Sequence, residues 1–443
     1  MLGAASLIFG GGALLTHCGS GVGSQSTHSN NSFISSSGMN LMLNGSNFQF
    51  VGYNEAGDAN EWVNGCMSLP FSQSTLDAEY ARFQALGITI VRVFFFQSMA
   101  ISNGAINYAG FDRLISEAKS HGIRVVAVLV NHPLGSNGST ACEGTPAKYL
   151  DWFSQQPGSG NSPLYKTVES GYVLSYRDYV GQVAAHYANE PTIAWWELMN
   201  EPAAMTNSTT CQESLSGGIG AAQAIRQWAD DMASVIKTND PNHLIDLGTT
   251  GNPNYCGTQS GSYSSSSYCV AVGVSGCTND YEYAAMGTVS VNGKTLPSID
   301  LLTVHEYSSS YSGSDLLNFY SGITSELSAH LSEANSLNKP LYVGETGLLV
   351  TPAASGNGCG GAQENFSGAS CTSRSSCMDS KLHTFFSSSP TIAGALVWQA
   401  TPYQSGLDGD CYSVGYTGGS KGTSNGTIDP VDAILNKHAG GAP

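Results

Sequence analysis

The sequence predicts an α/β fold, a (β/α)8 TIM barrel with long loops after its strands. Three features of the 443 residues support this class: eight short apolar runs, amphipathic helical patterns that follow most of them, and long Cys-containing segments behind several runs. Strands that are apolar throughout and separated by helices belong to parallel sheets covered on both faces. Eight such units in about 400 residues close into a barrel rather than an open sheet.

The elements follow one another in a regular order. The predicted strands cover residues 48–54, 88–96, 123–130, 192–199, 243–248, 299–307, 340–346 and 392–399. The predicted helices cover residues 74–87, 111–122, 174–188, 220–238, 314–335, 376–389 and 430–439. No Gly-rich phosphate-binding fingerprint follows the first strand, which disfavours a dinucleotide-binding fold.

The chain divides into a leader, a linker and one folded domain. Residues 1–20 contain an apolar run that is too short and too glycine-rich to span a membrane comfortably, and we interpret them as a signal or leader. Residues 21–38 form a Ser/Gly-rich linker, and residues 39–443 form the domain that carries the barrel. A secreted protein is therefore expected, with a lipid anchor at the cell surface as the alternative that Cys18 leaves open.

The composition limits the partners. The chain has 33 acidic and 16 basic side chains, a formal net charge of -17, and only 11% charged residues. This balance disfavours binding to nucleic acid, to anionic membrane surfaces and to polyanionic substrates. A neutral ligand is the expected partner, and we expect a monomer with no cofactor and no metal.

Ten cysteines lie outside the leader, an even number that suggests up to five disulfides in an exported chain. No two of them have the CxxC spacing of zinc or thioredoxin-like sites. Almost all of them lie between a predicted strand and the start of the next helix, and in a barrel these loops share the face that holds active sites. They are Cys66, Cys142, Cys211, Cys256, Cys269, Cys277, Cys359, Cys371, Cys377 and Cys411.

Two glutamates lie at the ends of predicted strands. Glu201 follows the fourth strand in "WWELMNEP", and Glu345 ends the seventh in "PLYVGET". Because side chains alternate along a strand, Leu341, Val343 and Glu345 are expected on one side, and both glutamates are expected to point into the barrel opening. Hydrolysis of a glycosidic bond with retention needs two carboxyl groups about 5 to 5.5 Å apart. Either glutamate alone also fits a favourable charge at a helix N-terminus, but their joint placement favours a catalytic pair.

The tripeptide Asn-Glu-Pro occurs twice, at residues 189–191 and 200–202. Glu190 precedes the fourth strand and is therefore predicted in a turn on the opposite face of the barrel. A strand of about seven residues separates the two faces by roughly 20 Å. Only Glu201 is therefore predicted to be catalytic.

A histidine and a tyrosine lie at the end of the sixth strand. His305 and Tyr307 are two residues apart in "TVHEY", so they are expected to point the same way and Glu306 the opposite way. A tyrosine hydroxyl beside Glu345 would keep that carboxylate ionised and oriented. Packing of a buried histidine and tyrosine is the alternative.

One arginine and two tryptophans complete the candidates. Arg92 stands in the apolar run "IVRVFFF" and needs an anionic partner if it is buried. With Glu345 it would lower the pKa of a nucleophile, whereas with Glu197 the pair can be purely structural. Trp398, at the end of the eighth strand, is a candidate floor under a sugar ring or a core residue, and Trp62, in a loop, is a candidate stacking platform.

These residues resemble glycoside hydrolase family 5 of clan A. The resemblance runs from about residue 48 to 400 and depends on seven motifs in order, "VRVFF", "NH", "WELMNEP", "DPNHLIDLG", "VHEY", "GETG" and "VWQ". It implies that Glu201 is the general acid/base, Glu345 the nucleophile, and Asn200 a hydrogen-bond partner for the sugar 2-hydroxyl. It also implies that a set of residues lines the subsite at the cleaved bond, namely Arg92, Asn131 or His132, His305, Tyr307 and Trp398.

Within the family, "LVNH" and "SYRDYVGQVAAHYANEPTIAWWELMNEP" are most similar to secreted endo-β-1,4-mannanases. The implied activity is retaining cleavage of internal β-1,4 linkages in a neutral plant-type polysaccharide, β-mannan or glucomannan, with an endo-β-1,4-glucanase (cellulase) as the alternative. Two other classes stay open. One is a barrel that binds saccharide without cleaving it, and the other is a metal-dependent lyase or isomerase with Glu201, His305 and Glu345 as ligands.

Overall fold

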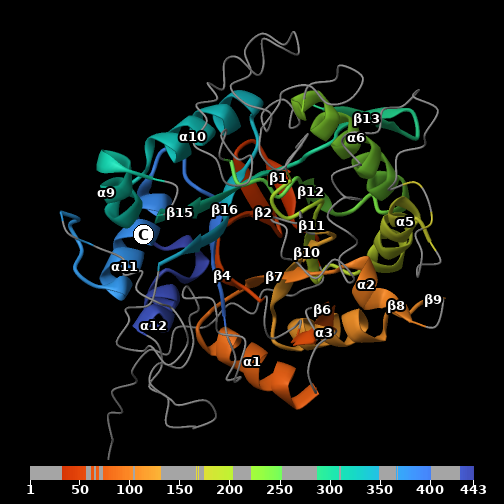
Figure 1. Cartoon of the computed structure of the whole chain (residues 1–443), viewed down its shortest axis with the longest axis horizontal. Coiled ribbons are helices and arrows are strands. Elements are labelled where there is room, and N and C mark those ends of the chain that lie inside the picture. The colour runs from red at the N-terminus through yellow and green to blue at the C-terminus, as the bar shows by residue number, and fades with distance from the viewer. Residues whose placement is uncertain are drawn as a thin grey trace, which may run out of the picture.

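The structure is a computed structural model of the 443-residue chain. It describes residues 32–55, 61–63, 66–68, 73–102, 105–130, 166, 168, 174–202, 221–251, 287–308, 311–348, 366, 368–400 and 430–443. Figure 1 shows these elements with strands at the centre and helices around them. Within these ranges, no helix combines the length and the apolar character needed to cross a bilayer.

Eight parallel strands form the central sheet and confirm the predicted barrel. They are β4 (Phe50–Asn54), β7 (Ile90–Phe94), β10 (Arg124–Val128), β11 (Ile193–Glu197), β12 (Leu244–Asp246), β15 (Leu302–Tyr307), β16 (Leu341–Gly347) and β17 (Gly394–Val397). Their order in the sheet is β12, β11, β10, β7, β4, β17, β16, β15, so the first barrel strand pairs with the last. The edge strands β12 and β15 meet through hydrogen bonds: Thr249 Oγ1 donates to Thr303 O at 2.8 Å, and His305 N donates to Thr250 O at 3.0 Å. These bonds close the ring.

Helices surround the strands (Figure 1). The longer ones are α1 (Gln73–Ala85), α3 (Ala109–Ser120), α5 (Tyr176–Tyr187), α6 (Ala221–Asn239), α9 (Gly313–Ser321), α10 (Ser325–Leu337), α11 (Arg374–Ser387) and α12 (Pro430–Lys437). Short elements are α2 (Gln97–Ala100), the 3-10 helix η4 (Ala439–Gly441) and the hairpins β5 (Glu61–Val63) with β6 (Cys66–Ser68), β8 (Ile101–Ser102) with β9 (Ala105–Ile106), and β13 (Thr288–Val291) with β14 (Lys294–Pro297).

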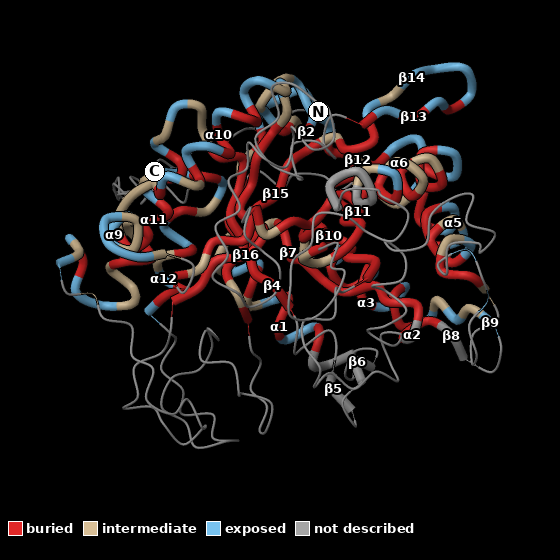
Figure 2. Tube along the Cα trace, turned by 45° about the horizontal axis from the view of Figure 1, so that its top comes forward, coloured by how far each residue is buried: buried red, intermediate tan, exposed pale blue. Residues whose placement is uncertain are grey.

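Two apolar layers hold the barrel together, one inside the strands and one between strands and helices. Trp195 lies inside, where its ring contacts Phe50 and Tyr342 at centroid distances of 5.7 and 5.2 Å. Trp196 lies outside, and its Nε1 donates to Asp240 at 2.7 Å. Figure 2 shows the result, with buried strands at the centre and exposed residues on the outer faces of the helices.

A small antiparallel sheet precedes the barrel. It consists of β1 (Ser35–Ser37), β2 (Asn40–Leu43) and β3 (Ser46–Phe48). Leu41 and Phe48 belong to the same apolar cluster as Phe50 and Ile90, the first residues of β4 and β7, so this sheet covers the end of the barrel where the strands begin. The range 21–38, predicted as a linker, therefore includes a strand. Its polar serines pair through backbone hydrogen bonds, which composition does not reveal.

The helix predicted over residues 314–335 is two helices in the structure. Gly322 ends α9 with extended backbone, and Thr324 begins α10 by accepting a hydrogen bond from the backbone N–H of Leu327 at 3.1 Å. A glycine followed by a capping threonine is a start and stop signal that outweighs the continuous apolar period.

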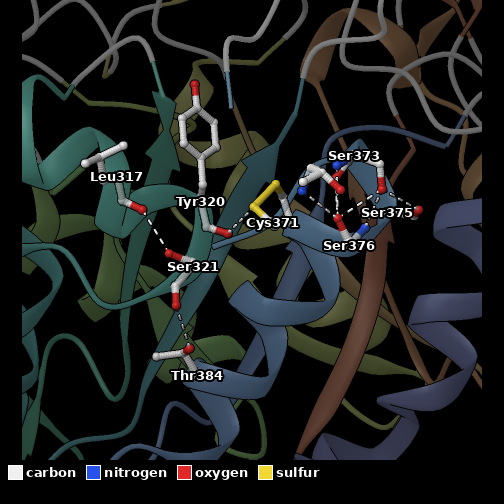
Figure 3. Close-up of a disulfide and its surroundings, with 10 residues drawn as sticks. Leu317, Tyr320, Ser321, Cys371, Ser373, Ser375, Ser376 and Thr384 are labelled. Carbon is white, nitrogen blue, oxygen red and sulfur yellow. Dashed lines mark hydrogen bonds between the residues drawn. A yellow bond between two sulfur atoms is a disulfide. The ribbon is translucent and has the colours of Figure 1, made fainter. Parts of the chain in front are cut away.

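One disulfide is described, between Cys371 and Cys377 at the entry to α11. Figure 3 shows it beside the end of α9, where Cys371 lies next to the carbonyl of Tyr320. Ser373 caps α11 by accepting a hydrogen bond from the backbone N–H of Ser376 at 3.2 Å. The side chains of the other eight cysteines beyond the leader lie outside the described residues.

Candidate active site

Polar side chains from several strand ends meet at the carboxyl end of the barrel, where active sites of this fold are found. The strands β4, β7, β15 and β16 and the residues that follow β11 supply, in chain order, Asn54, Arg92, Asn200, Glu201, His305, Tyr307 and Glu345. The structure therefore brings together six of the residues predicted from the sequence and adds Asn54.

Arg92 is the centre of this cluster. Its side chain is 1% exposed, and each of its five N–H donors has an acceptor. Nε and Nη2 donate to the two oxygens of Glu197 at 2.8 and 2.5 Å. Nη1 donates to Asn54 and to Glu345 at 2.8 and 2.7 Å, and Nη2 also donates to Asn200 at 2.6 Å. Both anionic partners suggested by the sequence are therefore present, and one guanidinium fixes the orientation of Glu345 and of the Asn200 amide.

Glu345 is buried among groups that favour its ionised form. Tyr307 donates its hydroxyl to Oε2 at 2.9 Å, Arg92 contacts Oε1, and His305 Nδ1 lies 3.5 Å from Oε2. Burial nevertheless raises the pKa of Glu345 above its usual range, and the nearby charge of Glu201 adds to this, while His305, Arg92 and Tyr307 oppose it. Arg92 therefore lowers the pKa of Glu345 as expected, but burial outweighs this effect and the net pKa is raised.

Glu201 has an unusual backbone conformation. Its φ of 52° lies in the left-handed region, which a glutamate rarely adopts. Its backbone N–H donates to Gly248 O at 2.8 Å, and Asn200 N–H donates to Val130 O at 2.8 Å, so neighbouring strand ends hold this turn in place. Strained residues of this kind cluster at functional sites. The Glu201 side chain forms a hydrogen bond with His305, with 2.9 Å between Glu201 Oε1 and His305 Nδ1.

The two carboxyl groups lie close together. An oxygen of Glu201, an oxygen of Glu345 and a ring nitrogen of His305 all lie within 4.8 Å of one another. This upper limit is close to the separation of about 5 to 5.5 Å between the carboxyl groups of retaining glycosidases and well below the roughly 6.5 to 9.5 Å of inverting ones. The geometry therefore suits attack by one carboxylate on the sugar rather than activation of a water between two.

The same three residues could hold a metal ion, as could Asp77, Glu117 and His121 on the outside of the barrel. In the inner group, both oxygens of Glu345 already accept hydrogen bonds, from Arg92 and from Tyr307. A guanidinium 2.7 Å from a ligand oxygen also repels a second cation. These contacts suit a pair of acids better than a metal centre.

A bulge in β16, and not the alternation of side chains along a regular strand, points Glu345 into the barrel. Leu341 and Val343 face the helices, and Tyr342 faces the barrel interior. The register shifts between Val343 and Thr346, so that His305 pairs with Glu345 directly after the pair of Val304 with Val343. This bulge turns Glu345 to the inside, and the prediction that it shares a side with Leu341 and Val343 was wrong. On β15, in contrast, His305 and Tyr307 point inward and Glu306 contacts Lys381 outside, as predicted.

The other residues predicted from the sequence either lie away from the cluster around Arg92 or fall outside the described part of the chain. Trp398 follows β17 and is partly buried against the outer apolar layer. Asn131 and His132 lie outside the described residues, and of Trp62 only the backbone, in β5, is described. Glu190 lies before β11 and pairs with Lys119 at 2.9 Å on the outside, which agrees with its predicted position.

Sequence reasoning missed Asn54. It ends β4, where its Oδ1 accepts from Arg92 and its Nδ2 donates to Gly344 O at 3.0 Å. The signal was available, since an amide that ends an apolar strand of a barrel stands at the face that holds active sites. Asp246 and Tyr342, deeper in the barrel, were also missed.

A TIM barrel with two close carboxyl groups at its carboxyl end defines a class, the glycoside hydrolases that act through a pair of acids. Residues 42–368 match the family described as Cellulase (glycosyl hydrolase family 5). Because the match covers more than half of the chain, the chain belongs to glycosyl hydrolase family 5, which confirms the resemblance.

Known relatives agree with this assignment. The chain is 28% identical over 336 residues to "Mannan endo-1,4-beta-mannosidase 1" of Oryza sativa subsp. japonica, covering 71% of this chain and 68% of the relative. An endo-1,4-beta-mannanase of Rhizomucor miehei shares the fold with a TM-score of 0.56 and 17% identity, covering 91% of this chain and 98% of the other. An endo-beta-1,4-glucanase of Xanthomonas axonopodis pv. citri does so with a TM-score of 0.53 and 15% identity, covering 89% and 100%.

Proposed function

We propose that the protein is a retaining endo-β-1,4-mannanase that cleaves internal linkages of β-mannan or glucomannan. The observation that carries the chemistry is the pair Glu201 and Glu345, whose oxygens lie within 4.8 Å of each other and both approach His305 Nδ1. The plant mannanase relative supports the substrate class. The low content of charged residues and the net charge of -17 suit a neutral polysaccharide.

In the first half of the reaction, Glu201 acts as the general acid. It gives its proton to the oxygen of the departing sugar while a Glu345 oxygen attacks the anomeric carbon from the other face. The bond from the anomeric carbon to the leaving oxygen breaks, and a covalent ester with Glu345 forms. Arg92 and Tyr307 hold the two Glu345 oxygens in position for this attack.

In the second half, Glu201 acts as the general base. It takes a proton from a water molecule, whose oxygen attacks the anomeric carbon and releases Glu345. Two inversions restore the original anomeric configuration. Asn200, oriented by the 2.6 Å bond to Arg92, is the proposed partner of the sugar 2-hydroxyl. Trp398, Trp62, Asn131 and His132 are proposed to line the substrate cleft around this centre.

An endo-β-1,4-glucanase is the second candidate, favoured by the solved glucanase of the same fold. Mannan and cellulose differ in the configuration at carbon 2 of each sugar, so the two candidates share the acids and differ in the contacts of the sugar ring. A saccharide-binding barrel without activity has no use for a buried Glu345 whose two oxygens are both held by hydrogen bonds, next to a Glu201 with a strained backbone.

The following experiment tests this proposal. The purified protein is incubated with mannan, glucomannan, carboxymethyl-cellulose, barley β-glucan and xylan, and new reducing ends are measured, with and without EDTA. We expect the highest rates on the two mannans, unchanged by the chelator. Glu201→Gln and Glu345→Gln should each lower the rate about 10³-fold, as loss of an acid-base group or a nucleophile does.

Glu190→Gln is the matched control, because it changes the same tripeptide on the far side of the barrel and should leave the rate unchanged. Rates within a few-fold of wild type for Glu201→Gln or Glu345→Gln would refute the site. Loss of activity in EDTA would favour the metal-dependent alternative, and exclusive hydrolysis of the glucans would reverse the order of the two substrates.

We also propose that the enzyme is exported. The apolar leader pattern over residues 1–20, the cysteine-rich segments and the polymeric substrate support an extracellular place of action. Immunodetection of the full chain in the medium and in the cell envelope of its host distinguishes release from a lipid anchor.

A further inference from the structure

A second group of polar side chains is buried inside the barrel beside Arg92. It consists of Asp246 on β12, Glu197 and Trp195 on β11, and Tyr342 on β16, all with 0% exposure. The Tyr342 hydroxyl contacts Asp246 Oδ2 and lies 3.4 Å from Glu197 Oε2. Trp195 Nε1 donates to the Tyr342 oxygen at 3.3 Å. One hydroxyl therefore stands between two carboxyl groups.

The charges of this interior do not balance if every carboxyl group is ionised. Glu197, Glu345 and Asp246 would together carry three negative charges against the single positive charge of Arg92. Glu201 and His305 pair with each other at 2.9 Å and do not contact Asp246. Three negative charges against one positive charge leave two uncompensated, and uncompensated buried charge is strongly unfavourable, so at least one of these groups must retain a proton.

Asp246 is the group best placed to keep that proton. Glu197 and Glu345 each accept hydrogen bonds from Arg92, whereas Asp246 accepts none from it within the described residues. One oxygen of Asp246, Oδ1, has no hydrogen-bond partner in the described part of the chain. Burial and the charge of Glu197 raise the pKa of Asp246 well above its usual range, against the opposing effects of Tyr342, Arg92 and Trp195.

We infer that Asp246 is a neutral carboxylic acid in the folded protein, and that it and Tyr342 are positioning residues that direct a hydrogen-bond chain onto Glu197 and Arg92. In this arrangement the Asp246 O–H donates to the Tyr342 oxygen, and the Tyr342 O–H donates to Glu197. If Asp246 were ionised, the single Tyr342 proton would turn to Asp246, and Arg92 would be the one side-chain donor to Glu197 left among the described residues.

The direction of this chain matters for Glu345, since Arg92 is shared. When the Glu197 carboxylate also accepts a hydrogen bond from Tyr342, its interaction with the guanidinium is weaker. Arg92 then interacts more strongly with the Glu345 oxygen, which lies 2.7 Å away. This consequence depends on the proposed role of Glu345 as nucleophile. The protonation of Asp246 itself does not depend on it.

Stability against pH tests the protonation without using activity. Melting temperatures of the wild type and of Asp246→Asn are compared from pH 4 to pH 8. A carboxyl whose folded pKa is raised contributes stability at low pH that is lost as the pH rises from its unfolded pKa of about 3.9 toward the folded value. Asn mimics the neutral acid and does not titrate. The melting temperature of the variant should therefore rise relative to that of the wild type as the pH rises, and at pH 7 it should equal or exceed it.

Asp432→Asn is the matched control. Asp432 is also buried and also accepts from a tyrosine hydroxyl, that of Tyr53 at 2.5 Å, but Arg82 contacts both of its oxygens at 2.8 and 2.9 Å. This variant should melt below the wild type at pH 7, because it removes a carboxylate that Arg82 contacts through both oxygens. The same pattern for Asp246→Asn, or a chain that fails to fold while Asp432→Asn folds, would overturn the inference.

Infrared difference spectra give a second test on the folded protein at neutral pH. Because Glu201 also carries a proton as the general acid, the two spectra are subtracted. The wild type minus Asp246→Asn difference should contain the carbonyl band of one protonated carboxylic acid, and a difference without this band contradicts the proposal. Tyr342→Phe tests the positioning role: we expect kcat to fall about tenfold with little change in KM, and the acidic limb of kcat/KM to move to higher pH. A fall in melting temperature with unchanged kcat and pH profile would show a merely structural tyrosine.

If the wild type cleaves no mannan, the proposed function fails, but the stability and infrared tests still decide the protonation state of Asp246.

Discussion

At the scale of single residues, the site depends on one arginine with every donor in use. The position of Arg92 in an apolar run predicted a buried ion pair, with Glu197 and Glu345 as the candidate partners. It could not show that both bind at once, because a five-donor fork meets its acceptors only after four strands have come together. For the same reason Asn54 and Tyr342 escaped notice.

Tyr307→Phe tests how the ionised Glu345 is maintained. Burial already raises the pKa of Glu345, and the variant removes the hydrogen bond of 2.9 Å that opposes this rise. The nucleophile acts in its ionised form, so activity should be lost first on the acidic side. We expect the acidic limb of kcat/KM to move up by about one pH unit, because a hydrogen bond to a charged group contributes about 1.5 kcal/mol and one unit corresponds to about 1.4 kcal/mol.

Tyr80→Phe serves as the control for this shift. Tyr80 also donates to a buried glutamate, Glu55 at 3.2 Å, but that carboxyl group is not part of the cluster around Arg92. Its pH profile should match that of the wild type. An unmoved acidic limb in Tyr307→Phe, or an equal shift in Tyr80→Phe, would show that the hydroxyl does not act on Glu345.

At the scale of elements, irregular strand ends aim the two acids. Period-two alternation correctly predicted the directions of His305 and Tyr307 on the regular end of β15. Alternation gave the wrong side for Glu345, because a bulge in β16 reverses which side chains point into the barrel. It also cannot predict the left-handed backbone at Glu201. Bulges and positive φ angles are stabilised by contacts between distant strands, which a local pattern does not contain.

Gly248→Ala tests the support of the Glu201 turn. Gly248 has a φ of 82°, and an added Cβ would lie 2.0 Å from Met199 O and 2.5 Å from Glu197 Oε1. Gly122→Ala is the control, since its φ is 74° but no atom of the described residues lies within 4 Å of the added atom. In urea unfolding, the control should lose about 1 kcal/mol for its left-handed backbone and Gly248→Ala about 3 kcal/mol or more. Equal losses would mean that the close approach to β11 contributes nothing.

At the scale of the whole molecule, the count of eight apolar runs was sufficient to predict the barrel, because each run must be covered by helices on one side and by its fellow strands on the other. The sheet of β1 to β3 was not predicted, since its first strand is three serines held by backbone bonds. Closure between β12 and β15 likewise depends on residues just beyond the strands. The barrel brings acids that are 144 positions apart, Glu201 and Glu345, within reach of one sugar.

The central claim is that Glu345 attacks the sugar, and trapping the covalent intermediate tests it most directly. An activated 2-deoxy-2-fluoro-β-mannoside should glycosylate the enzyme quickly, because its leaving group needs no help from Glu201, and should deglycosylate slowly. Digestion and mass spectrometry should then find the added sugar on the peptide that contains Glu345 and on that residue. A sugar attached to another residue, or turnover with an inverted first product and no adduct, would contradict the account.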